Sequence, residues 1–296
     1  MRSHNRKHDV QFLYKYVTAT TAISVLTTQA LRWSSPLILN DPFDVPREWE
    51  GFTFAELEDA MVQRFGSYLR GEARPRSAAA LNLLQILQSQ SGTTPEEVIF
   101  SQVRFFLRLM KKPMEKYMVD FQVAWRERLP GIRILSFSED PASTTMWAHY
   151  AQSHMGVVLQ FESSDERDSS WLLAQPVIYQ TKRPSLPGAI EWVRAFMDEI
   201  EVDWDEVLRE YNFVKHTDWS HEREHRVVSA RKQTETGLYA DYVFHPEDLR
   251  GVVLGANIDP QNEKAIRGLI AANYPNANIY GAQIDYANRS IVLVAT

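Results

Sequence analysis

The stretch from Lys215 to Ala230 holds the densest group of side chains in this sequence that could exchange protons, bind a cation or bind an anion. Three histidines, two glutamates and two arginines fall within eleven residues around Trp219. Carboxylates and imidazoles serve as metal ligands and as general acids and bases, and arginine binds carboxylate or phosphate. The spacing permits two incompatible interpretations, which differ in the secondary structure that they require.

In the first interpretation the stretch is a helix. His221 and His225 would then lie one turn apart with Glu222 between them, which is the His-Glu-x-x-His pattern of zinc-dependent hydrolases. His245 and Glu247 are candidates for a third ligand. This metal-dependent hydrolase or nuclease is the alternative hypothesis, because a strand-like sequence follows at once and we expect no bound metal.

In the second interpretation the stretch enters a strand at Val227 and Val228. Alternation would place Glu222, Glu224 and Arg226 on one face of that strand. Such a set could hold a ligand and stabilise a developing positive charge. It could equally be a structural network of ion pairs in a module that binds a ligand or protein without catalysis.

The elements that must position these residues are short strands and helices without a regular βαβ period. Strands are expected near residues 10–17, 31–34, 132–138, 157–161, 177–179, 251–255, 279–284 and 290–294. The pattern predicts one α+β domain over residues 10–296 with a central mixed sheet, in one piece or split. Apolar residues at three- and four-residue spacing predict a helical insertion over residues 54–128 and a helix over residues 188–214.

Composition excludes several classes of protein. The 296 residues contain no cysteine, which rules out disulfides and thiolate nucleophiles. The net charge of −6 argues against broad phosphate binding. No run approaches the roughly 18 apolar residues of a membrane span, and no apolar segment follows the basic tail of residues 1–9. We therefore expect a cytoplasmic protein that does not contact a membrane.

The loop Asn40-Asp41-Pro42-Phe43-Asp44 has the composition of a turn, because proline fixes its own φ and pushes the preceding residue out of the helical region. We expect Phe43 to pack on the core. Polar turns of this kind often form the wall of a site, and we expect the loop to lie beside the strand that carries Glu224.

Several short motifs, spread over nearly the whole chain, together resemble a widespread bacterial family of unassigned function. They are Tyr14-Lys15-Tyr16, Leu31-x-Trp33-Ser34-x-Pro36, the loop from Asn40 to Asp44, Ser136-Phe137-Ser138, Met146-Trp147-x-x-Tyr150 with Gly156, and Lys215-x-x-x-Trp219-x-x-Glu222-x-Glu224-x-Arg226. The family pattern contains Glu222 and Glu224 but neither His221 nor His225. The resemblance therefore favours the strand interpretation.

The order of a polar first strand, a Ser-x-Ser strand and a Glu-x-Glu strand is also similar to the layout of ADP-ribosyltransferases. That resemblance implies that Glu224 is the catalytic carboxylate and that Glu222 acts on the acceptor. It assigns a supporting place on the sheet to Ser136 or Ser138. Where those enzymes use an arginine or a histidine to bind NAD, this chain has Tyr14-Lys15-Tyr16, so Lys15 would take that part.

The predicted function is therefore an NAD-consuming transferase that acts as a toxin or antiviral defence effector. NAD would be a co-substrate, with no tightly bound cofactor, and the acceptor would be a protein or a nucleic acid. A partner or regulator protein is also expected. The residues predicted to contact the nucleotide are Tyr14, Lys15, Tyr16, Asn40, Asp41, Ser136, Ser138, Trp147, Tyr150 and Arg226.

Overall fold

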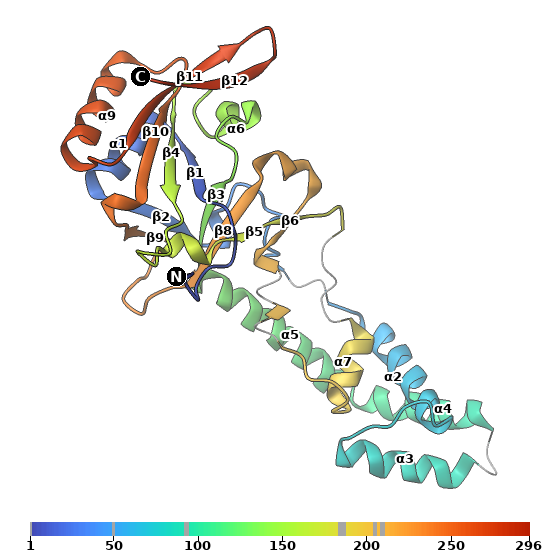
Figure 1. The fold of residues 1–296 in the computed structure, drawn as a ribbon. Coiled ribbons are helices and arrows are strands. Elements are labelled where there is room, and N and C mark those ends of the chain that lie inside the picture. The colour runs from blue at the N-terminus through green and yellow to red at the C-terminus, as the bar shows by residue number, and fades with distance from the viewer. Residues whose placement is uncertain (1, 49–50, 92–94, 183–187, 204–205, 208–210) are drawn as a thin grey trace. The chain divides into compact units, whose positions relative to one another are not determined.

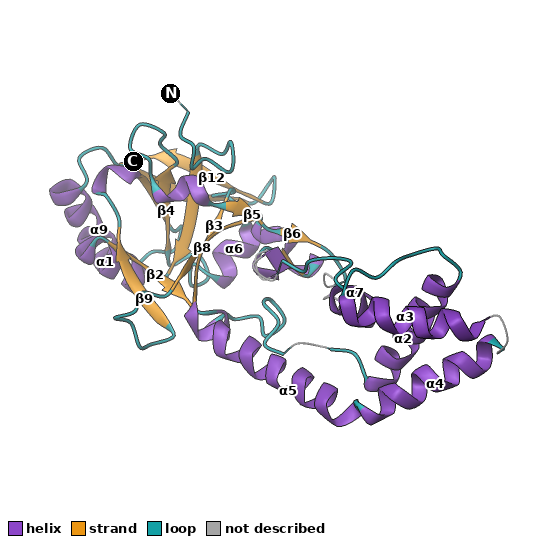
Figure 2. Cartoon of the chain, turned by 90° about the horizontal axis from the view of Figure 1, so that it is seen from below, coloured by secondary structure: helices purple, strands orange, loops and turns teal. Residues whose placement is uncertain are grey.

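The computed structural model describes the chain apart from residues 1, 49–50, 92–94, 183–187, 204–205 and 208–210 (Figure 1). The chain forms two compact units. Unit 1 comprises Met1–Arg47, Leu129–Arg183 and Asn212–Thr296, and unit 2 comprises Glu48–Arg128 and Pro184–Tyr211. Strands dominate the first unit and helices the second, as Figure 2 shows by colour.

Unit 1 is built on a ten-stranded mixed sheet. Its main path runs β12-β11-β10-β4-β1-β3-β2-β9, and β8 pairs with both β3 and β5. The pair β10–β11 is parallel and the other pairs are antiparallel. The strands are β1 (Phe12–Val17), β2 (Ala30–Ser34), β3 (Ile132–Ser138), β4 (Val157–Glu162), β5 (Gln175–Pro176), β8 (Glu224–Ala230), β9 (Tyr239–Val243), β10 (Leu249–Leu254), β11 (Asn278–Asp285) and β12 (Ser290–Ala295). The predicted α+β class with a mixed sheet is confirmed.

The sheet forks at β3. One edge of this strand pairs with β8 along its whole length, from Ile132 to Ser138. The other edge pairs with β2 at Ile134 and with β1 at Ser138. Because β1 and β2 meet the same edge at different points, they must diverge between these two contacts.

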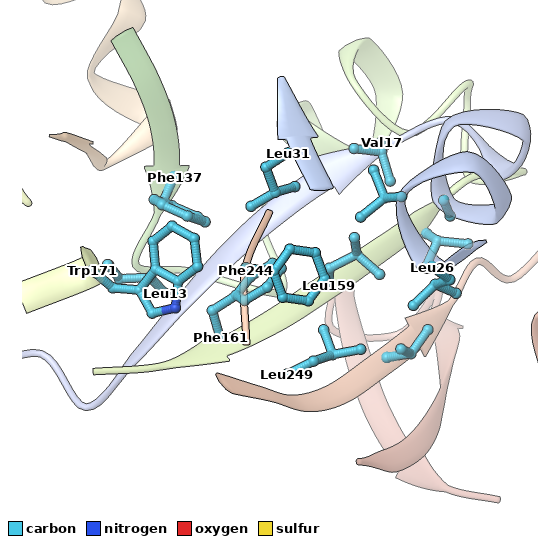
Figure 3. Packing of buried hydrophobic residues seen from close by; sticks show 14 of the residues in the cluster. Leu13, Val17, Leu26, Leu31, Phe137, Leu159, Phe161, Trp171, Phe244 and Leu249 are labelled. Carbon is cyan, nitrogen blue, oxygen red and sulfur yellow. The ribbon is translucent and has the colours of Figure 1, made fainter. Parts of the chain in front are cut away.

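Apolar residues cover both faces of this sheet. The larger core packs β1, β3, β4 and β10 against α1 (Ala19–Thr28) and α9 (Pro260–Asn273), and it includes Leu13, Phe161 and Trp171 (Figure 3). A smaller cluster on the other face holds α6 (Thr144–His149) against Tyr16. Thr18 caps α1 by accepting a hydrogen bond from the backbone N–H of Thr21.

Three short elements lead into β8. A second, two-stranded sheet pairs β6 (Ile178–Tyr179) with β7 (Val214–Lys215) in parallel. The 3₁₀ helix η4 (Thr217–Glu222) follows β7, and β8 begins two residues after it ends. Two further 3₁₀ turns, η1 (Pro36–Ile38) and η2 (Leu129–Gly131), flank the long segment that forms most of unit 2.

Unit 2 contains α2 (Phe54–Leu69), α3 (Ala78–Ser91), α4 (Glu96–Leu109), α5 (Lys111–Arg128) and α7 (Ala189–Phe196). A capping box of Thr53 and Glu56 starts α2. The prediction of one helix over residues 188–214 is wrong in its extent. Residues 197–203 are not helical, and Asp198 has a left-handed φ of 56°. Part of the predicted helix lies outside the described residues. The carbonyl of Met197 instead accepts backbone hydrogen bonds from Arg76 and Ser77.

Candidate functional site

Glu222 and Glu224 lie together, but a single strand does not carry them. Glu222 is the last residue of η4, Arg223 takes a left-handed conformation with φ 43° and ψ 52°, and β8 begins at Glu224. The expectation that alternation along one strand unites these carboxylates is therefore wrong. Left-handed geometry is costly for a residue other than glycine and is found where the surroundings enforce it. Here Arg223 forms an ion pair with Glu139, and the turn that it makes brings both carboxylates to one cation.

That cation is Lys215, the last residue of β7. Its Nζ lies 2.6 Å from Oε2 of Glu222, 3.5 Å from Oε2 of Glu224 and 3.6 Å from Oδ2 of Asp44. It also lies 4.6 Å from the ring centre of Trp219. Burial lowers the pKa of Lys215, but the three carboxylates outweigh this effect and raise it. The ammonium group therefore stays charged and holds three carboxylates around one point.

Arg226 binds two of these three carboxylates. Together with Lys215, Asp44, Glu222 and Glu224 it forms a buried charged cluster. Nε and Nη2 donate to Glu224 at 2.7 and 2.8 Å, while Nη1 and Nη2 donate to Asp44 at 2.8 and 2.6 Å. Nη1 also donates to the carbonyl of Asn212 at 2.8 Å. These five hydrogen bonds match the five N–H donors of a guanidinium. Arg226, predicted to contact the nucleotide, thus positions Glu224 and Asp44 in this structure.

Tyr150 connects Glu222 to the surface. Its hydroxyl donates to Oε1 of Glu222 at 2.6 Å and accepts from the amide of Asn40 at 2.7 Å. Asn40 is exposed and Tyr150 is half-buried, whereas the side chains of Asp44, Glu222 and Glu224 expose 5% or less. A continuous hydrogen-bonded chain therefore runs from solvent to the buried carboxyl group of Glu222. The loop that carries Asn40 and Asp44 lies against the site at both ends.

The pKa values of the two glutamates move in opposite directions. Burial raises the pKa of Glu222, the carboxylate of Glu224 raises it further, and Lys215 and Tyr150 offset only part of this. Burial acts in the same direction on Glu224, but the ion pair with Arg226, followed by the charge of Lys215, outweighs it. The pKa of Glu224 consequently lies well below its ordinary range. Glu222 therefore holds a proton more readily than an ordinary glutamate, and its neighbour Glu224 stays ionised.

Lys15 lies at the fork of the sheet. Its Nζ donates to the carbonyl of Ser136 on β3 at 2.7 Å, close to where β1 separates from β3. Burial lowers the pKa of Lys15 to about 8, although Glu224 and Glu222 pull it upward. The hydroxyl of Ser136 contributes to the low pKa of Glu224. Lys15 and Ser136 are both half-buried, so they border the cluster on a partly accessible side.

The other residues predicted to contact a nucleotide serve the surrounding fold. Trp147 is fully buried and donates to the carbonyl of Pro141. The hydroxyl of Tyr16 donates to the carbonyl of Asp140, and that of Ser138 donates to the carbonyl of Glu222. The hydroxyl of Tyr14 accepts from Gln160. Of these hydrogen bonds, the one from Ser138 reaches a residue of the charged cluster, and it does so at the backbone carbonyl of Glu222.

The two aspartates in the loop of residues 40–44 bind different partners. Oδ1 of Asp41 accepts a hydrogen bond from the backbone N–H of Phe43, which closes a local turn. Asp44 binds Arg226 instead. The prediction that Phe43 packs on the core is wrong, because 69% of this side chain is exposed.

The helix that the zinc interpretation requires is absent from this described segment. The left-handed Arg223 lies between the 3₁₀ helix and β8, so His221 and His225 are not one helical turn apart. Nδ1 of His221 lies 3.0 Å from the carbonyl of Asp218, and the ring of His225 packs edge-on against His8. Among the described residues no group of three or more His, Cys, Asp and Glu side chains is arranged to hold a metal ion.

Sequence reasoning missed four residues that the site uses. Asp44 and Lys215 were visible in the motifs, but nothing showed that they share Glu224 and Arg226. Tyr179, whose hydroxyl accepts from the backbone N–H of Glu224, and Asn212 gave no signal, because each acts through a main-chain group.

A family model matches the segment that carries part of this site. Residues 146–227 match a family described as a protein of unknown function, DUF2971. The matched segment includes Tyr150, Lys215, Glu222, Glu224 and Arg226, and it ends one residue after Arg226. No curated protein and no solved structure matches the chain. Across the described residues, the helices are too short or too polar to cross a membrane.

Proposed function

We propose that this chain is an enzyme that cleaves the N-glycosidic bond of a nucleotide, with NAD as the substrate, and passes the ADP-ribosyl group to an acceptor. One observation carries the proposal. Glu222 and Glu224 bind the same ammonium group of Lys215, and their surroundings push their pKa values apart. A pair of carboxyl groups with separated pKa values is the usual arrangement for glycosyl transfer.

In this proposal Glu224 is the carboxylate that stabilises the positive charge developing on the ribose. When the bond between nicotinamide and ribose breaks, the electron pair leaves with the ring nitrogen and the sugar develops oxocarbenium character. A carboxylate held in advance stabilises that charge without having to reorganise. Arg226 keeps Glu224 ionised and fixes both of its oxygens, while Lys215 at 3.5 Å is a looser contact on the side shared with Glu222.

Glu222 is the base that acts on the acceptor. Nicotinamide leaves as a neutral molecule, so the departure needs no acid, but an acceptor hydroxyl must lose its proton as it attacks. That proton passes to the carboxylate of Glu222. The raised pKa makes Glu222 a stronger base than an ordinary glutamate at neutral pH. The proton then leaves for solvent through the hydroxyl of Tyr150, which is half-buried, while the amide of Asn40 donates to that hydroxyl and holds it in place.

Lys15 and Ser136 are proposed to border the bound nucleotide. Both are partly accessible and adjoin the glutamate pair. A cation in this position would bind a phosphate oxygen of NAD, as the resemblance to ADP-ribosyltransferases also implies. An enzyme that consumes NAD in this way would suit the toxin or defence role expected from the sequence.

Tyr150→Phe is the sharpest test of the proposed function, because it removes one hydroxyl and leaves every charge in place. The hydrogen bond from Tyr150 lowers the pKa of Glu222, so its loss should raise that pKa and move the acid limb of the pH–rate profile to higher pH. At pH values below the new pKa, where Glu222 is protonated and cannot accept a proton, turnover should fall by up to about a hundredfold, the lower end of what a general base contributes, and at higher pH it should approach the wild-type rate. Tyr242→Phe is the matched control, since its hydroxyl also donates to a carboxylate, Glu235, at 2.7 Å.

Wild-type protein that releases no nicotinamide from NAD would overturn the proposal. So would equal rates and unshifted pH profiles in the two variants, because a purely structural network predicts only a small loss of thermal stability in both. Glu224→Gln should also abolish turnover, by roughly 10²–10³-fold. It is the less clean variant, since the new amide would face the donors of Arg226.

A further inference from the structure

Unit 2 contains a large pocket that the proposed chemistry does not use. It has a volume of about 880 Å³ and is lined from α2, α5, α7 and the segment of residues 197–202. Ligand sites for small molecules usually span roughly 300–1,000 Å³. The pocket lies wholly among residues of this one helical unit.

Aromatic rings and methionines form the walls of the pocket. The ring centre of Trp192 lies 5.8 Å from that of Phe52 and 5.5 Å from that of Tyr117, and both pairs meet edge to face. Met61 is buried and Tyr117 is 58% exposed. Edge-to-face packing keeps large apolar rings in fixed positions, and methionine adapts to irregular shapes. These walls suit a ligand that contains rings and little polar surface.

The charges along the pocket argue against an anion. One guanidinium, that of Arg76, and three carboxylates, those of Asp198, Glu199 and Glu201, belong to the lining. Glu199 is already bound by Arg64 and by the hydroxyl of Tyr68. Those bonds, with the ion pair to Arg64, overcome the effect of burial and lower its pKa, so that Glu199 stays ionised. Arg64 offsets Glu199, and Arg194 lies 3.7 Å from it. The charges left in the lining are those of Asp198 and Glu201 against Arg76, so an anion would still meet one more carboxylate than cations.

We propose that this pocket binds an uncharged, ring-containing apolar molecule. The inference stands on the pocket alone and does not depend on the proposed function of the glutamate pair. Its occupant would bury its rings against Trp192, Phe52 and the methionines. Because the pocket joins three helices, a bound molecule would also stabilise unit 2 against unfolding.

Two fluorescent probes with the same skeleton test the proposal on the full chain: neutral 1-N-phenylnaphthylamine and its sulfonated counterpart, 1-anilinonaphthalene-8-sulfonate. The neutral probe should bind at least about tenfold more tightly, a difference of about 1.4 kcal/mol. Ala195→Trp places a large ring in the lining and should weaken binding of the neutral probe by about tenfold or more. Ala189→Trp makes the same change on the same helix outside the lining and should leave binding unchanged.

Equal affinity for the two probes, or equal effects of the two tryptophan variants, would overturn the proposal. A thermal melt shows whether Ala195→Trp is folded. If it is not, Tyr117→Ala replaces it, because this exposed side chain contributes to the wall without supporting the core. Binding of the neutral probe should then fall by about threefold or more, in line with the loss of one aromatic contact. An unchanged affinity in Tyr117→Ala would count against the inference.

Discussion

Asp44→Asn removes one charge from the buried cluster and keeps the shape of the side chain. Asp44 accepts two hydrogen bonds from Arg226, at 2.8 and 2.6 Å, and lies 3.6 Å from Nζ of Lys215. After the substitution one oxygen can still accept from Nη1. The new amide, however, points its own hydrogens at Nη2, so a charge-assisted bond becomes a contact between two donors.

The expected loss of stability is large because both partners are buried. Removing one member of a buried ion pair typically costs about 3–5 kcal/mol. For a protein of this size each kcal/mol lowers Tm by about 2–4 °C, so the Tm of Asp44→Asn should fall by roughly 6–20 °C. Circular dichroism melts at pH 7 measure this directly. Asp41→Asn, three residues away, is the control: its oxygen can still accept from Phe43, and Tm should change little.

A double variant tests whether the cost arises from the pair. Combining Asp44→Asn with Arg226→Met removes both charges, so it should cost less than the sum of the two single changes by more than about 0.5 kcal/mol. Strict additivity would refute the reasoning. So would a Tm for Asp44→Asn that equals that of Asp41→Asn, because the loop would then be held by its local turn and not by Arg226.

Two further predictions concern the fork and its neighbourhood. The pKa of Lys15 is about 8 in the folded chain and lies below the ordinary value of 10.5, so between these values the unfolded state binds more protons and stability should rise with pH. Between pH 8 and 10 the free energy of unfolding of the wild type should therefore rise by up to about 1.4 kcal/mol per pH unit relative to that of Lys15→Met. Denaturant titrations at several pH values measure this, and an equal pH dependence of the two proteins would contradict it. A Cβ at Gly156 would lie 2.3 Å from the carbonyl oxygen of Val17, whereas one at Gly131 would meet nothing within 4 Å. Gly156→Ala should cost about 1–3 kcal/mol and Gly131→Ala far less, as melts of both would show.

The class of the fold was predictable because apolar periodicity is a local property. Alternation marked β1 and β3, and the three- and four-residue spacing marked the helices of unit 2. The fork at β3 was not predictable, since it depends on where two distant strands leave one edge. The same limit explains the error after Phe196, where spacing continued but Met197 made backbone bonds to Arg76 and Ser77.

Part of the candidate site was predictable for a different reason. Glu222, Glu224 and Tyr150 stand in motifs dense in polar and aromatic side chains, which drew attention to them. The two glutamates do lie together, but the predicted reason was wrong. Strand alternation was expected to bring them to one face, whereas the left-handed residue Arg223 brings them together. The same residue removes the helical spacing of His221 and His225. No local pattern distinguishes these outcomes, since the αL conformation of an arginine is imposed by tertiary contacts.

A buried network of ion pairs needs no route to solvent in order to stabilise a fold. The mutual hydrogen bonds of Arg226, Asp44 and Glu224 would therefore not by themselves distinguish a catalytic site from a structural network. Glu222 differs from them, because its second oxygen is bound by a tyrosine that is itself bound by exposed Asn40. It is also the glutamate whose pKa is raised, so it is the stronger base of the two. The cluster thus joins a rigid, permanently ionised part to a proton-exchanging part. That division is what a glycosyl-transfer site requires of its two carboxyl groups.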